Sequence, residues 1–226
     1  GKRLEAMISK KTWALLTRAS KALGVSPAMF SPMRPWVAAI LLGQLKMAQK
    51  GLSLSRGKEQ LLTGHPSRRG KKTLALEKAV EQLSIFYSLS AKLQETLLLD
   101  AANDVLQETK TQKPGEMTIE RAYASGSLSA VRKVLLRGYD AYPEFLPLRK
   151  KLFDDRNLRM VKGIHRLAGP KSSLFIAVGV GHFPGRQGIL SLLRKKGYTL
   201  TRIAPMGLEK PAHAHVRGAK GAAVQN

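Results

Sequence analysis

Cysteine is absent from the 226-residue chain. Its absence excludes disulfide bonds, thiolate nucleophiles and metal sites built from cysteine. Aromatic residues are scarce at 6%, and no apolar run reaches the roughly 18 residues that a membrane-spanning helix needs. The longest apolar run, Trp36 to Leu42, ends at Gly43, so we interpret it as part of a buried helix in which Trp36 anchors the core.

Acidic residues are also scarce, since 15 Asp and Glu stand against 39 Lys and Arg and give a net charge of +24. Residues 1–76 hold 15 basic and 2 acidic side chains, residues 77–155 hold 11 and 12, and residues 156–226 hold 13 and 1. The two ends therefore carry a positive field that attracts nucleic acid, anionic lipid or acidic substrates. A solvated basic surface with incidental polyanion affinity explains the same composition. No recognisable nucleic-acid-binding motif accompanies the charge.

Helical spacing of apolar residues dominates the chain. The caps and spacings predict helices over about 10–23, 35–49, 78–89, 91–109, 118–126, 128–136, 143–167 and 189–196. We expect the segment from about 78 to 168 to form a helical cap inserted between strands. Residues 1–204 are expected to form one domain. In residues 205–226, Gly, Ala, Lys and His replace the apolar pattern, which predicts a mobile basic tail.

Three short runs have the composition of strands. Leu174 to Val178 is apolar and partly β-branched, and a glycine-rich loop follows it and presents His182 just past the predicted strand end. A helix and a further strand, Tyr198 to Ile203, come next, and Thr73 to Glu77 is a brief strand earlier in the chain. These runs predict an α/β fold with a small central sheet. Open α/β sheets bind their ligands at such strand ends.

The loop and its surroundings resemble the C-terminal signature of the TraB/GumN family. The resemblance rests on segments in a fixed order that run from about Ser9 to Ile203: Arg34-Pro-Trp36, Leu76-Glu77, Glu81-Gln-Leu83, Ala122-Tyr-Ala-Ser-Gly126, Arg156-Asn157, and Phe175-Ile-Ala-Val-Gly-Val-Gly-His-Phe-Pro-Gly185 with the Gly-Ile-Leu-Ser-Leu-Leu helix after it. It implies an α/β domain related to erythromycin-esterase-like and ChaN-like proteins.

The resemblance also implies an activity. A secreted animal branch of this family, the TIKI proteins, resembles metalloproteases that use two Gly-X-X-His motifs and a glutamate. The expected function is therefore metal-dependent hydrolysis of a peptide or small ester, with a divalent ion as cofactor. A periplasmic or otherwise exported location is expected on the same ground, while the sequence leaves the oligomeric state open.

The chain departs from the family pattern at its start. Family members begin with a strand ending in Gly-Thr-X-His and a second strand carrying glutamate, whereas the sole Gly-X-X-His here is Gly179 to His182. We expect that the sequence starts late and that its hydrolase site is incomplete without the missing motif. Lys58 also stands where relatives often carry aspartate.

His182 and Glu77 are the predicted catalytic residues and metal ligands, because imidazole and carboxylate groups both bind divalent ions and transfer protons. Arg156 is the third predicted catalytic residue, since it can bind a substrate anion or keep a catalytic carboxylate charged. Structural alternatives stand beside these roles: Glu77 can stabilise a helix N-terminus, and Arg156 can pair with Asp154 or Asp155. The predicted supporting residues are Gly179, Gly181, Gly185, Gln82 and Asn157.

Two other classes of function stay open at this point. The first is a binding or regulatory module without catalysis, which predicts an intact site and no turnover. The second is a basic polyanion-binding protein, whose affinity falls steeply with salt and does not depend on His182.

Overall fold

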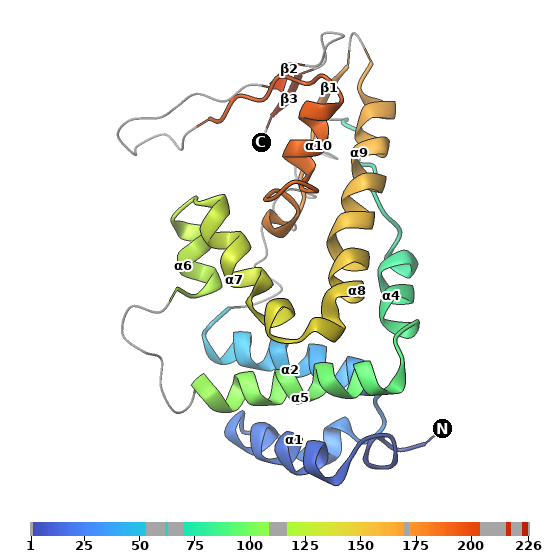
Figure 1. Ribbon diagram of the computed structural model, residues 1–226, viewed down its shortest axis with the longest axis vertical. Helices are drawn as coiled ribbons and strands as arrows, with labels where there is room; N and C mark the ends of the chain where they lie inside the picture. Colours follow the sequence, from blue (N-terminus) through green and yellow to red (C-terminus); the bar gives the residue numbers. More distant parts are fainter. Residues whose placement is uncertain are drawn as a thin grey trace. The chain divides into compact units, whose positions relative to one another are not determined.

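Two compact units make up the computed structural model of the chain, which describes residues 2–52, 62, 70–108, 117–169, 172–203, 216–217 and 223–225 (Figure 1). Unit 1 consists of residues 1–73 and 83–116, and unit 2 consists of residues 74–82 and 117–226. Helices account for most of the described residues. Lys58 lies outside the described residues.

Unit 1 is built from three helices that the sequence predicts closely. They are α1 (Lys10–Ala22), α2 (Pro35–Gln49) and α5 (Ala91–Glu108), with the single turns η1 (Leu4–Ala6) and η2 (Pro27–Phe30) around α1. Ser9 caps α1 by accepting a hydrogen bond from the Thr12 amide, and Pro35 occupies the first turn of α2. α4 (Ala79–Tyr87) begins in unit 2 and ends in unit 1.

The core of unit 1 lies where α1 and α2 pack against α5. Leu16, Leu42 and Leu98, one from each helix, are fully buried. Trp36 is also buried and stacks on Phe86 with ring centroids 5.3 Å apart, which confirms its predicted role as a core anchor.

Unit 2 contains most of the residues of interest. Its elements are α6 (Ile119–Ala124), α7 (Leu128–Ala141), η4 (Pro143–Phe145), α8 (Leu146–Arg149), the π-turn η5 (Lys150–Asp154), α9 (Asp155–Leu167), β1 (Ser173–Phe175), η6 (Val180–His182), α10 (Ile189–Lys195), β2 (Val216–Arg217) and β3 (Ala223–Gln225). The apolar face of α9 packs against α10, and this contact forms the core of the unit: Met160, Val161, Ile164, Ile189, Leu192, Leu193 and Tyr198.

The expected helix over 143–167 forms, but its first half is not a regular α-helix. Three short pieces, the 3-10 turn η4, the α-helical turn α8 and the π-turn η5, follow one another directly before α9 begins. Pro147 lacks an amide hydrogen, and it stands where an uninterrupted helix would need that donor. The helix becomes regular at Asp155, where the strongly amphipathic α9 begins.

The described residues are predominantly helical, as the sequence indicated, and they do not confirm the α/β part of the predicted fold. The predicted strand at Leu174 to Val178 is reduced to the three residues of β1, and the described residues at 73–77 and 198–203 form no strand. β3 pairs in parallel with β1 and antiparallel with β2, each over two or three residues. Leu76, Ile176, Val178 and Leu200 pack onto the α9–α10 core, so helices bury the side chains that had suggested a sheet.

Most of the predicted mobile tail, residues 205–226, lies outside the described residues, and only β2 and β3 are described within it. Among the described helices, none has both the length and the apolar character that crossing a membrane requires.

Candidate functional site

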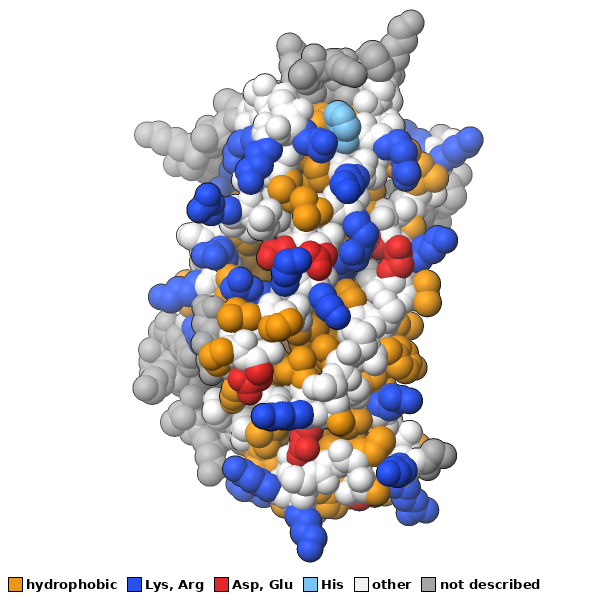
Figure 2. Space-filling model, turned by 45° about the vertical axis from the view of Figure 1, so that its right-hand side comes forward, with side chains coloured by type: hydrophobic (Ala, Val, Ile, Leu, Met, Phe, Trp, Pro, Cys, Tyr) orange, Lys and Arg blue, Asp and Glu red, His pale blue; other side chains and the backbone are white. Residues whose placement is uncertain are grey.

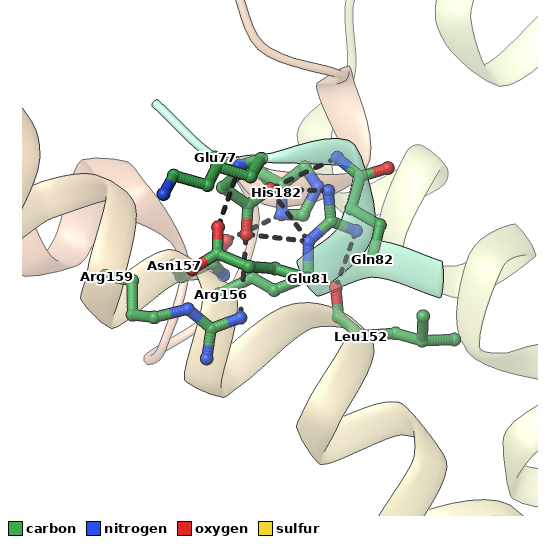
Figure 3. A network of polar contacts seen from close by, with 9 residues as sticks. Glu77, Glu81, Gln82, Leu152, Arg156, Asn157, Arg159 and His182 are labelled. Carbon is green, nitrogen blue, oxygen red and sulfur yellow. Dashed lines mark hydrogen bonds and ion pairs between the residues drawn. The ribbon is translucent and has the colours of Figure 1, made fainter. Parts of the chain in front are cut away.

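The predicted site residues of unit 2 come together from three places in the sequence (Figure 3). Glu77 precedes α4, Arg156 and Asn157 occupy the first turn of α9, and His182 ends η6. Hydrogen bonds connect Glu77 to Arg156 and Asn157 to His182. The structure therefore brings the two predicted metal ligands and the predicted arginine into one neighbourhood.

The loop that carries His182 depends on glycines. The amide of His182 donates to the carbonyl of Gly179 at 2.9 Å, which closes the single turn of η6. A Cβ atom on Gly181 would lie 2.9 Å from a methyl carbon of Leu135 and 3.3 Å from the ring of Phe153. Gly185 has a φ of +91°, which side chains other than glycine rarely adopt. Gly181 and Gly185 thus support the loop through close packing and backbone conformation.

Gly188 is a structural residue that the sequence analysis did not single out. A Cβ atom at this position would lie 2.2 Å from the carbonyl oxygen of Phe183, which is closer than atoms can approach. The sequence contains a feature that could have indicated this role. Gly188 is the residue before α10, a position where Ser, Thr, Asp or Asn usually caps a helix, and as a glycine it provides no side-chain cap.

The orientation of the His182 ring is fixed by Asn157. The Asn157 Nδ2 group donates to the Gln187 carbonyl oxygen at 2.7 Å, so the Oδ1 atom of Asn157 must face His182. His182 Nδ1 lies 2.7 Å from that oxygen and has to carry the proton that it donates. In the neutral ring the Nε2 atom then holds the free lone pair. Nε2 makes no hydrogen bond within the described residues.

His182 is held in its neutral form. Only 8% of the residue is exposed, and its ring centroid lies 5.6 Å from that of Phe153. Burial lowers the pKa of the His182 imidazole below its usual value, and the charge of Arg156 lowers it further, while the charge of Glu77 opposes both effects. A neutral ring with a free Nε2 can accept a proton or bind a metal ion.

Glu77 forms a buried ion pair with Arg156. The Arg156 Nε atom lies 3.0 Å from both carboxylate oxygens of Glu77, and its Nη2 atom lies 2.8 Å from Oε2. The remaining nitrogen, Nη1, donates to the Leu152 carbonyl oxygen at 3.2 Å. The two side chains are 5% and 15% exposed, so the pair is largely removed from water. Such a bidentate geometry is the strongest form of this interaction.

Two further groups complete the surroundings of the Glu77 carboxylate. Arg159 Nη2 lies 3.6 Å from Oε1, and Gln82 Nε2 donates to Oε2 at 3.4 Å. Burial alone would raise the pKa of the Glu77 carboxyl group, but the hydrogen bonds and charge of Arg156, together with Arg159, outweigh it and the pKa lies below its usual value. The carboxylate is therefore ionised at neutral pH.

These contacts bear on the structural alternatives that the sequence left open. At the start of α4 the Lys78 amide donates to Glu81 at 2.7 Å, whereas Glu77 accepts hydrogen bonds from Arg156 and Gln82. Arg156 pairs with Glu77, whereas Asp155 pairs with Lys150 at 2.6 Å. Arg159, which the sequence analysis missed, stands one helical turn after Arg156, and that spacing could have suggested it.

The residues fit a metal site only in part. His182 suits a ligand, because the Nδ1–H group is held by Asn157 in the way that metal-binding histidines are commonly oriented. Glu77 fits poorly, because two guanidinium groups adjoin its carboxylate and would repel a divalent cation. No group of three His, Asp or Glu side chains suited to a metal ion occurs among the described residues.

Comparison with known families agrees with the resemblance found in the sequence. The sequence profile of the TraB/PrgY/gumN family matches residues 1–202. Since the match covers most of the chain, the protein belongs to this family.

Two curated relatives are similar over part of the chain. Metalloprotease TIKI1 of Homo sapiens is 29% identical over 178 aligned residues, which cover 67% of this chain and 34% of the relative. Metalloprotease TIKI2 of Danio rerio is 32% identical over 85 residues, which cover 37% of this chain and 15% of the relative. The matched regions thus span only a minor part of each relative's length. No solved structure matches the chain.

Proposed function

We propose that this protein is a hydrolase and that His182 is a central residue of its site. The observation that carries the proposal is the hydrogen-bonded series from the Gln187 carbonyl through Asn157 to His182, which leaves Nε2 with a free lone pair. A fixed imidazole of this kind serves as a general base or as a metal ligand in hydrolytic sites. The similarity to two proteins named metalloproteases supports hydrolysis as the class of reaction.

In the proposed site, His182 contributes Nε2 and Asn157 orients the ring. A divalent metal ion at Nε2 would supply a polarised water for attack on an amide or ester. The remaining ligands would come from outside the described residues. The substrate class that we propose is a peptide or a small ester.

Glu77 and Arg156 have a supporting role in this proposal. Their ion pair places a compensated negative charge beside the ring, and the Glu77 charge limits how far burial and Arg156 lower the pKa of His182. Arg156 keeps Glu77 ionised, as one of the sequence-based interpretations predicted. We therefore propose Glu77 as a residue that adjusts the basicity of His182 and not as a metal ligand.

The test measures metal binding and turnover in the complete gene product, so that any segment encoded upstream of Gly1 is present. Wild-type protein, His182→Ala and a control, His165→Ala, would be dialysed against Zn²⁺, Mn²⁺ or Co²⁺, and bound metal would be quantified by mass spectrometry. His165 is an exposed histidine of the same unit, and its ring contacts Tyr198 and not the site. We expect the His182 variant to lose metal and the control to keep it.

Activity is measured in parallel on a protein substrate and on a chromogenic ester. Loss of turnover in His182→Ala with retained folding supports the proposal. Absence of divalent metal from the wild-type protein, or metal binding that survives the His182→Ala change, would contradict it. A folded protein without any turnover would favour a binding or regulatory module instead.

A further inference from the structure

Cations gather at one end of the α9–α10 pair. From Arg156 to Leu208 the sequence contains no acidic residue. Arg159, Lys162 and Arg166 follow one another at spacings of three and four, so they lie on one face of α9, and all three are exposed. The last turn of α10 and the residue after it add Arg194, Lys195 and Lys196, which are also exposed.

The two basic helix ends are neighbours. Tyr198, just beyond α10, places its hydroxyl 2.9 Å from His165 Nδ1 in the last turn of α9. Figure 1 shows the C-terminal ends of α9 and α10 beside β1. We refer to Lys162, Arg166, Lys195 and Lys196 together as the basic end. None of these four forms an ion pair with a described residue, so no described carboxylate of unit 2 compensates their charges.

Large apolar side chains are exposed at the same end. Phe175 lies in β1, the element that follows α9 in the chain, and is 68% exposed. Leu74 is 60% exposed and stands two residues before Leu76, which lies over Gly163 of α9. In the upper part of Figure 2, Lys and Arg side chains surround a group of hydrophobic ones. Exposed apolar groups of this size commonly mark an interaction surface.

Two simpler explanations account for part of this pattern. Cations in the last turn of a helix interact favourably with the helix dipole, and they would do so without any partner. Duplex nucleic acid would also attract the cations, but its phosphate groups would not bury the exposed side chains of Phe175 and Leu74. A bilayer surface with anionic lipids matches both features, because headgroups attract the cations and the interface accepts the apolar side chains.

We propose that the basic end, together with Phe175 and Leu74, docks unit 2 on an anionic lipid surface. The proposal does not involve His182, so it is independent of the hydrolase proposal. It also differs from a general effect of the net charge, because it assigns binding to one end of one unit.

The experiment measures partitioning of the full chain onto large vesicles by co-sedimentation. Vesicles of phosphatidylcholine with phosphatidylglycerol are compared with vesicles of phosphatidylcholine alone. The test variant combines Arg166→Gln, Lys195→Gln and Lys196→Gln. The matched control combines Lys10→Gln, Lys11→Gln and Arg18→Gln, which removes the same three charges from the exposed face of α1 in unit 1. A third variant is Phe175→Ala, and circular dichroism checks the folding of each.

We expect the test variant to bind anionic vesicles on the order of a hundredfold more weakly than the wild type, at about 1 kcal/mol for each surface cation. The control should lose much less, and Phe175→Ala should weaken binding by roughly tenfold. Equal losses in the two triple variants would overturn the proposal, since they would point to net charge alone. The proposal would also be overturned if Phe175→Ala bound anionic vesicles as strongly as the wild type. A third contrary result would be that the protein binds duplex DNA more tightly than vesicles and that Phe175→Ala does not change the DNA binding.

Discussion

Asn157 accepts the Nδ1 proton of His182 at 2.7 Å while it donates to the Gln187 carbonyl oxygen at the same distance. The two hydrogen bonds determine which way the amide of Asn157 faces, and the amide in turn determines which ring nitrogen of His182 carries the proton. A buried histidine is thereby given one tautomer and one orientation. The Nε2 atom becomes the part of the ring that is available for chemistry.

Replacement of Asn157 by aspartate should raise the pKa of His182. A carboxylate at this position stabilises the imidazolium form by hydrogen bonding and by its charge. It also faces the Gln187 carbonyl oxygen without a donor, so we expect a loss of about 1–3 kcal/mol in the free energy of unfolding. NMR titration of the ring measures the pKa. Asn103→Asp adds the same charge in unit 1 as a control, and an equal shift in both variants would contradict the role of Asn157.

The ion pair of Glu77 and Arg156 should show strong energetic coupling. Glu77→Gln alone leaves a largely buried guanidinium without its partner and should cost about 3 kcal/mol of unfolding free energy. A double-mutant cycle with Arg156→Met, followed by denaturant unfolding, isolates the pairwise part. The exposed pair of Lys150 and Asp155 is the comparison, with an expected coupling below about 1 kcal/mol. Equal coupling free energies for the two pairs would contradict the burial of the Glu77–Arg156 ion pair.

Stability should fall with acid in two separate pH ranges. The lowered pKa of His182 means that the unfolded ring takes up a proton below about pH 6.5 while the folded ring does not, so stability decreases as the pH falls below that value. The lowered pKa of Glu77 means that its stabilising effect is present above about pH 4.3 and is lost as the pH falls through the folded value.

The variant His182→Gln separates the two ranges. It should remove the decrease that begins near pH 6.5 and keep the decrease at lower pH, as measured by urea unfolding at a series of pH values. A profile identical to that of the wild-type protein between about pH 5 and 7 would contradict the lowered pKa of His182.

Gly181→Ala should destabilise unit 2. The added methyl group meets Leu135 at 2.9 Å and Phe153 at 3.3 Å, and relieving this overlap should cost about 1–3 kcal/mol. Gly43→Ala is the matched control, because Gly43 lies inside α2 with nothing within 4 Å of the added carbon. The control should be stabilising by about 0.5–1 kcal/mol. Thermal unfolding of both variants measures the difference, and a stabilising Gly181→Ala would contradict the packing described for the loop.

The helices were predictable because local signals agree with the final packing. Ser9 at the start of α1, Pro35 at the start of α2 and Gly197 after α10 stand at the helix boundaries that the sequence indicated. The strands were harder to predict from the sequence, because a short apolar run is compatible both with a strand and with a loop that packs on the core. Leu76 and Leu200 are apolar residues that pack against the α9–α10 core and are partly buried there without a neighbouring strand.

The site was predictable as a set of residues but not as a set of contacts. His182, Glu77, Arg156, Asn157 and Gln82 were all expected from sequence, and the structure places them together. Their pairing depends on the helical phase of α9, which points Arg156 toward Glu77 and Asn157 toward His182. The Gln187 carbonyl is a backbone group, and sequence patterns carry no information about where such a group will point.

The central claim is that His182 presents an unprotonated Nε2 at neutral pH. The most direct measurement is a long-range ¹H–¹⁵N correlation spectrum of protein labelled with ¹⁵N in its histidines, assigned with the His182→Gln variant. The account predicts that at pH 7 the His182 ring carries its proton on Nδ1 and shows the ¹⁵N shift of a free nitrogen at Nε2. A proton on Nε2, or a ring charged at both nitrogens, would contradict it.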